Sequence, residues 1–186
     1  MRKSLITATI CAVAAMSMAF AACAEASDYQ SMKRGFGNIN EASGMEKIIE
    51  VKNGDFLISS VVEIYKSSQN GYLVTTTTKT LNPIGEGEGM YTETVEGPVT
   101  KWYLVTGSFP AESELKNAEF IGEGENLELE AVLSSDYLAK LGLSSEDCSG
   151  EVTFASTLAD GNLTDMELEY LSSNGNNVTI SFIFDY

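Results

Sequence analysis

This chain of 186 residues contains no histidine and only three cysteines. The lack of histidine excludes the Ser-His-Asp and Cys-His arrangements that activate a nucleophile. It also excludes the usual zinc sites, which need clustered cysteine and histidine. A strand–turn–helix nucleophile elbow is missing as well. We therefore expect no catalytic residues, no metal site and no cofactor, and we do not expect an enzyme.

Basic residues are scarce too. Lysine and arginine number 11 against 27 acidic residues, which gives a formal net charge of −16. Arg2 and Lys3 lie in a predicted leader, and without that leader nine basic residues remain and the net charge is −18. Nucleic acid binding needs clustered basic residues that replace phosphate counterions, so this charge argues against it. It also argues against adsorption of the folded domain to anionic lipid headgroups.

Residues 1–22 have the parts of a secretory signal. Arg2 and Lys3 form a basic start, and residues 5–22 carry no charge and are mostly apolar. The apolar stretch is rich in alanine and slightly short for a membrane span, which needs about 20 strongly apolar residues. We predict a signal peptide over 1–22, and therefore an exported protein. A retained single-span anchor is the alternative.

Cys23 is the predicted point of lipid attachment. It follows Phe20-Ala21-Ala22, an apolar residue and two small residues, which resembles the bacterial lipobox. The resemblance implies that Cys23 is diacylated and becomes the mature N-terminus, so that an acyl anchor holds the protein at the cell membrane or cell surface. Ordinary cleavage at a nearby small-x-small site is the alternative, and it predicts a secreted or periplasmic protein.

Cysteine usage agrees with lipidation. Cys11 is lost with the signal, and Cys148 is the only cysteine of the predicted folded part. A lone cysteine cannot form an internal disulfide. If Cys23 stays in the mature chain without a lipid, a Cys23–Cys148 bridge becomes an option.

Residues 24–44 are rich in glycine, serine, asparagine and charge, which predicts a flexible tether over 23–44 that begins at the lipid-attachment cysteine. From residue 45 to 186 the dominant period is two, so we predict a single β-rich domain. The segment 56–65 is apolar on both faces, and we expect cover on both sides. In a single curved sheet, one face of such a strand would pack on a lid or on an apolar ligand.

Turn signals divide the domain into short strands. Asn53-Gly54 predicts a hairpin, and Gly97-Pro98 predicts another between strands over 91–96 and 99–106. The glycine-rich segment 85–89 is predicted to be a loop. Trp102 and Leu104 are expected to share one face of their strand.

A short helix and three strands are predicted at the C-terminal end. Ser135 is a candidate N-cap, and Gly142 is typical of a residue that ends a helix. The following alternation predicts three strands joined by short turns. We predict a mainly β fold (α+β is the variant), an antiparallel meander of about eight to eleven strands that forms a strongly curved sheet or half-barrel with one or two short helices. A β-sandwich is the alternative.

Paired acids are abundant, and two of the pairs are candidates for acid–base chemistry. Glu128 with Glu130, or Glu167 with Glu169, would suit a hydrolase that flanks a sugar with two carboxylates. Acids two residues apart on a strand more simply mark its solvent-facing side, and we favour that interpretation.

The order of these features resembles the LolA/LppX-like lipoproteins. The features are the lipobox-like start, the tether, the long meander, one short helix late in the chain, and a final apolar strand that ends near a tyrosine. The resemblance covers about 45–186 and implies a strongly curved half-barrel over helices that holds lipid or acyl chains in its concavity. The family usually opens with a longer amphipathic helix, for which this chain offers only 28–34. The resemblance assigns no site residues.

The sequence thus favours an exported, lipid-anchored, non-enzymatic envelope protein that binds an apolar ligand such as lipid. A β-sandwich module that binds protein or glycan through loops or edges is the alternative. A hydrolase that uses carboxylates alone is the least favoured class.

Overall fold

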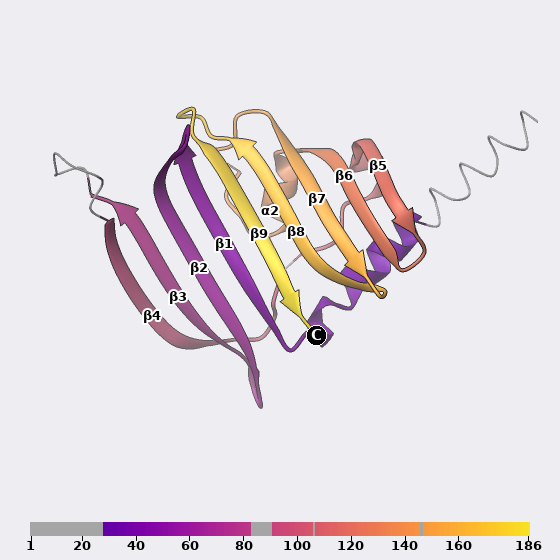
Figure 1. The fold of residues 1–186 in the computed structure, drawn as a ribbon, viewed down its shortest axis with the longest axis horizontal. Coiled ribbons are helices and arrows are strands. Elements are labelled where there is room, and N and C mark those ends of the chain that lie inside the picture. Colours follow the sequence, from indigo (N-terminus) through magenta and orange to yellow (C-terminus); the bar gives the residue numbers. More distant parts are fainter. Residues whose placement is uncertain (1–27, 83–90, 106, 146) are drawn as a thin grey trace, which may run out of the picture.

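The computed structural model describes residues 28–82, 91–105, 107–145 and 147–186. The predicted signal, Cys23 and the loop over 85–89 lie outside the described residues. Nine strands form one antiparallel sheet in the order β4-β3-β2-β1-β9-β8-β7-β6-β5 (Figure 1). The strands are β1 (Gly44–Asn53), β2 (Phe56–Ser68), β3 (Gly71–Leu81), β4 (Tyr91–Lys101), β5 (Lys116–Glu123), β6 (Asn126–Ser134), β7 (Glu151–Ala159), β8 (Asn162–Leu171) and β9 (Asn177–Asp185).

The sheet consists of two meanders joined side by side. Strands β1–β4 form one and β5–β9 the other, and the first strand pairs with the last through Met45 opposite Phe184. The predicted turn at Asn53-Gly54 is present, with Gly54 at a φ of 55°, a conformation that glycine adopts at no steric cost. Strands β4 and β5 are the two edges, so the sheet is open. This arrangement confirms the prediction of a single curved sheet and excludes the β-sandwich.

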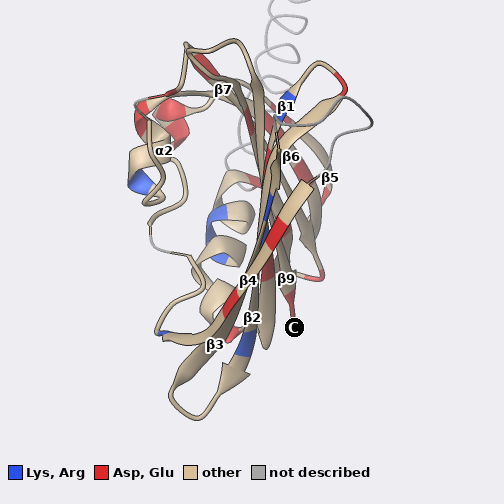
Figure 2. Ribbon diagram, turned by 90° about the vertical axis from the view of Figure 1, so that its left-hand side faces the viewer, with Lys and Arg blue, Asp and Glu red and all other residues tan. Residues whose placement is uncertain are grey.

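All described helices lie on one side of this sheet, which we call the helix face (Figure 2). They are a helix that includes residues 28–37, the short 3-10 helices η1 (Ile39–Glu41) and η2 (Glu112–Glu114), and α2 (Asp136–Lys140). None of the described helices lies over the opposite, outer face. On strands β6–β9 the period of two separates buried apolar residues on the helix face from polar residues on the outer face.

The helix over 28–37 is part of the folded core. Tyr29, Met32 and Phe36 are buried at helical spacing, and Ile39 continues the apolar stripe. A Cβ on Gly35 would overlap the side chain of Leu158, so the helix approaches the sheet closely there. The structure therefore differs from the flexible tether predicted over 23–44. Only four large apolar residues are needed to dock this short helix, too few to stand out in a segment rich in polar residues.

A long crossover, described over residues 102–105 and 107–115, connects the two meanders across the helix face. Phe109 anchors it, with ring centroids 5.9 Å from Tyr29, 5.7 Å from Phe36 and 6.1 Å from Phe154. Two tyrosine hydroxyls fix its backbone: Tyr29 donates to the carbonyl of Pro110 at 3.0 Å, and Tyr137 donates to Ser108 at 3.1 Å. The crossover and the N-terminal helix thus pack together on the β5–β9 meander, where they meet Phe154 and Leu158 of β7.

Strand β4 corrects two predictions. It runs unbroken through Gly97-Pro98, where a hairpin was predicted. The break in pairing is instead a register shift against β3 between Val74 and Thr76. Proline is tolerated there because an edge strand does not need every N–H for the ladder. The strand ends at Lys101, so Trp102 and Leu104 do not share a strand face; Trp102 is 70% exposed and Leu104 is buried.

Burial of β2 also differs from the prediction. Cover on both sides was expected over 56–65, but most of these residues are only half-buried and Phe56 and Ile64 are exposed. The predicted C-terminal elements are confirmed: α2 begins after Ser135 and ends before Gly142, and β7–β9 form the expected three-stranded meander. Ser135 precedes the helix as predicted, but its side chain makes no capping hydrogen bond.

Candidate functional site

The helix face of the β1–β4 meander has a regular arrangement of side chains in four rows. The pairing of the strands defines the rows, since residues opposite one another on neighbouring strands share a face. From β9 to β4 the rows are Phe184–Met45–Tyr65–Val74–Val99, Phe182–Lys47–Glu63–Thr76–Glu96, Ile180–Ile49–Val61–Thr78–Thr94 and Val178–Val51–Ser59–Thr80–Thr92.

Cover stops partway along these rows. In the first row Met45, Tyr65 and Val74 are buried. In the third and fourth rows every residue on β1–β4 is half-buried or exposed, while the β9 members Ile180 and Val178 remain buried. Figure 1 shows the reason, because the helices lie over the β5–β9 meander.

We call this uncovered part of the helix face the open floor. Strands β1 and β2 contribute its apolar residues, and its other residues are serine and threonine. They are Ile49, Val51, Ser59, Val61, Thr78, Thr80, Thr92 and Thr94. No charged residue belongs to it, although one residue in five of the chain is charged.

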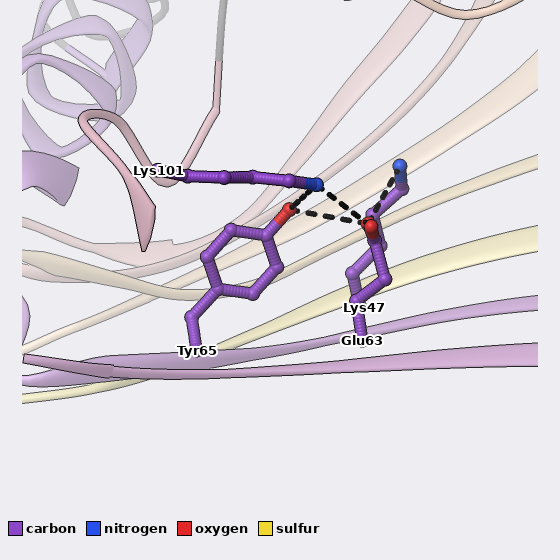
Figure 3. Close-up of polar contacts among 4 residues, drawn as sticks. All are labelled: Lys47, Glu63, Tyr65 and Lys101. Atoms are coloured by element: carbon purple, nitrogen blue, oxygen red, sulfur yellow. Dashed lines mark hydrogen bonds and ion pairs between the residues drawn. The ribbon is translucent and has the colours of Figure 1, made fainter. Parts of the chain in front are cut away.

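A charged cluster marks the border between the covered rows and the open floor (Figure 3). Lys101 donates to Glu63 Oε1 at 2.7 Å and to the hydroxyl of Tyr65 at 3.0 Å. Tyr65 in turn donates to Glu63 Oε2 at 3.1 Å, and the Lys47 ammonium lies 3.3 Å from the same oxygen. Two cations thus share one carboxylate, which leaves the cluster with one net positive charge.

Electrostatics hold the cluster in this charge state. Burial alone would raise the pKa of Glu63, but the hydrogen bond from Lys101 and the charges of Lys47 and Lys101 outweigh it and the pKa lies below its usual value. Burial would lower the pKa of Lys101, but its bonds to Glu63 and Tyr65 raise it. Burial is the main cause of the raised pKa of Tyr65. At neutral pH Lys101 is therefore an ammonium group, Glu63 a carboxylate and Tyr65 a neutral phenol.

A cavity of about 200 Å³ lies against this cluster. Its sheet side is formed by Lys47, Tyr65, Lys101 and Phe182, and its other side by the crossover and the end of α2. Lys47 also lies over the ring of Phe182, 5.9 Å from the centroid. Tyr103 of the crossover lines the cavity while being 62% exposed. The cavity therefore combines two ammonium groups with aromatic and aliphatic walls.

The acids considered in the sequence lie elsewhere. Glu128, Glu130 and Glu169 are exposed and Glu167 is half-buried, all on the outer face. Strand β7 separates the two pairs, and its Ala155 lies between Glu130 and Glu167. This confirms that the pairs mark the solvent-facing side of their strands. Cys148 is free and is half-buried beside β8, while Cys23 lies outside the described residues, so its lipidation stays a prediction.

Sequence reasoning missed the cluster, although a signal was present. Lys47 interrupts the apolar series Met45-x-Lys47-x-Ile49 on one face of β1. Glu63 interrupts the series of β2 in the same way. A charge of each sign within an otherwise apolar strand face suggests a pair across the sheet. The contribution of Lys101 was out of reach, because it depends on β4 continuing past Gly97-Pro98.

No group of three or more His, Cys, Asp or Glu side chains is arranged to hold a metal ion in the part of the chain that the structure describes. Over the same residues, no helix combines the length and hydropathy that crossing a bilayer requires.

Comparisons with known proteins give little more. Neither a protein-family model nor a curated protein matches the sequence. Among solved structures, the crystal structure of LprF from Mycobacterium bovis is similar with a TM-score of 0.46 and 12% sequence identity, over 83% of this chain and 90% of that chain. The likeness is one of architecture and is weak, and neither the fold nor the site described above depends on it.

Proposed function

We propose that this is an exported envelope protein, anchored by lipid on Cys23, that binds an apolar ligand on the open floor and catalyses no reaction. The observation that carries the proposal is the contrast between the two halves of one sheet face. On β6–β9 the apolar residues of the helix face are almost all buried, whereas the third and fourth rows on β1–β4 offer uncharged, partly apolar side chains that no described segment buries.

Physical chemistry favours a ligand there. Exposed apolar area costs about 25 cal/mol per Å² relative to burial, so apolar side chains gain free energy when a ligand covers them. The floor adjoins the core, because Ile49 and Val51 pack against it from the side. A ligand lying on the floor would therefore extend the existing core across β1 and β2. The anchor and the export signal would keep such a protein where apolar compounds are handled, at the membrane surface.

Adjacent valines on β2 allow a matched test. Val61 lies on the open floor and Val62 lies on the outer face, and both are half-buried. Val61→Asn should weaken binding of a fluorescent apolar probe such as anilinonaphthalene sulfonate, while Val62→Asn should leave it unchanged at a similar cost in stability. Equal effects of both substitutions, or no probe binding at all, would refute the proposal. Mass spectrometry of organic extracts of the protein purified from its source should reveal the natural ligand.

The interaction module remains a second candidate because of one feature of the outer face. Ile64, Leu73 and Val95 are exposed there at 41–63% and lie on the neighbouring strands β2, β3 and β4. Such a patch would suit a protein partner. Under this alternative Val62→Asn would impair function and Val61→Asn would not, so the same pair of variants separates the two candidates.

A further inference from the structure

We propose that the ligand is a free long-chain carboxylate, with its head at Lys47 and Lys101 and its chain along the open floor. This inference rests on the function proposed above and deepens it by naming the chemical class of the ligand. Three features of the site support it: its charge, its size and its continuity with the floor.

The charge of the cluster is the first argument. Lys47, Glu63 and Lys101 together carry one net positive charge, within a chain whose formal net charge is −16. An ammonium group has three N–H donors. The described contacts of Lys101 use two of them, on Glu63 and Tyr65. A second carboxylate would use the remaining donors and bring the cluster to neutrality.

Burial makes these donors effective. The side chains of Lys47 and Glu63 are 18% and 15% exposed, and that of Lys101 is 41% exposed. Charges held in such a partly desolvated site interact more strongly than charges in open water. The greater exposure of Lys101 leaves its ammonium accessible from the cavity. The cluster can therefore accept an anion without rearranging its internal contacts.

The size of the cavity limits the head group. Sites that enclose a drug-sized ligand measure about 300–1,000 Å³, whereas this cavity measures about 200 Å³. It accommodates a carboxylate and the first few methylene groups, but a bulky glycerophosphate head would fill it completely. The rest of the chain must leave the cavity. Its way out runs from Lys47 to Ile49 and then Val51, which follow one another on the same face of β1.

The charge of the whole protein favours a free carboxylate over the head groups of an anionic membrane. A surface with so large an excess of acid is repelled by an anionic membrane. A single free amphiphile carries one charge and can reach the small positive cavity between the sheet and the crossover. We therefore assign the site to a monomeric fatty acid anion and not to the head groups of an anionic bilayer.

The experiment compares oleate with oleyl alcohol, which has the same chain and no charge, by calorimetry on the protein purified after export. We expect oleate to bind more tightly. Lys101→Met and Lys47→Met should each weaken oleate roughly tenfold or more, since each removes a charged hydrogen-bond donor, and leave oleyl alcohol unchanged. Glu63→Gln should strengthen oleate binding, because it adds one positive charge to the site. Lys79→Met on the outer face is the control and should have no effect.

Each other result overturns the inference. Equal affinity for oleate and oleyl alcohol, unaffected by these variants, would leave the apolar site standing but remove the head-group assignment. Binding of neither compound would remove the proposed function as well. Binding to phosphatidylglycerol vesicles without binding of monomeric oleate would show that the cluster meets a membrane instead. Because Glu63→Gln and the lysine variants are expected to act in opposite directions, a general loss of folding cannot imitate the expected pattern.

Discussion

Replacing Met32 by alanine tests whether the N-terminal helix is part of the fold. A tether would tolerate this change without loss of stability. In the structure, however, Met32 has no exposed surface and lies between the helix and the sheet, with its sulfur 3.9 Å from the hydroxyl of Ser156 on β7. Alanine would leave a cavity at this contact, because Phe36 and Tyr29 on the same helix are held by the crossover.

The size of the effect follows from burial. Truncation of a fully buried methionine to alanine costs about 2–5 kcal/mol in free energy of unfolding. Proteins of this size are stable by about 5–15 kcal/mol, so the variant would lose a large share of the total. With about 2–4 °C of melting temperature per kcal/mol, the midpoint should fall by roughly 4–20 °C.

Urea unfolding followed by circular dichroism measures this change, with Gln30→Ala as the control. Gln30 is exposed on the same helix, and its replacement should alter stability by no more than about 0.5 kcal/mol. If Met32→Ala were as mild as Gln30→Ala, the helix would not be docked on the sheet. The covered half of the helix face would then have to be reassigned, and with it the border at which the open floor begins.

Three further predictions concern the cluster, the crossover and the helix. The pKa of Glu63 is lower in the folded protein than in the unfolded chain, so its charge stabilises the fold at neutral pH, and this contribution disappears as the pH falls through the folded pKa. In urea unfolding at several pH values, Glu63→Gln should therefore lower the free energy of unfolding most near pH 7 and least in acid. A loss that does not change with pH would refute this. Phe109→Ala should lower stability by about 3–5 kcal/mol in thermal unfolding, against little change for the exposed Phe56→Ala, and similar effects of both would contradict the anchoring role. Gly35→Ala should destabilise the protein because the new Cβ would overlap a side chain of the sheet. In Gly37→Ala the new Cβ meets nothing within 4 Å, so this variant should gain up to about 1 kcal/mol from the higher helix propensity of alanine. The opposite order of melting temperatures would disprove the close approach of the helix to the sheet.

Strand alternation predicted the C-terminal meander almost residue by residue. On β7–β9 the apolar residues recur at every second position between clear turns, and one sheet face there is fully buried, so pattern and burial agree. Ser135 and Gly142 predicted the position of α2 in the same way. These signals are local, and local signals are what a single sequence carries.

The features that the sequence did not predict depend on contacts between residues far apart in the chain. Residues 28–44 look like a tether because their apolar residues are few, and only the sheet beneath them reveals that these few are all buried. Gly97-Pro98 is a turn signal in isolation, and the pairing of β4 with β3 overrides it. Lys47 and Glu63 are visible as interruptions of two apolar series, but their meeting depends on the register of β1 with β2.

The open floor follows from how the chain distributes its cover. The described segments that lie on the helix face are the N-terminal helix, the crossover and α2, and Phe109, Tyr29 and Tyr137 tie all three to the β5–β9 meander. Extending that cover over Ile49 and Val61 would require more chain on this side. An uncovered edge also invites pairing with other molecules, and β4 is guarded against it by Pro98 and by acids along the strand. A sheet half that is left open but protected at its edge is suited to a ligand in solution, and the positive cluster at its inner end favours an anionic one.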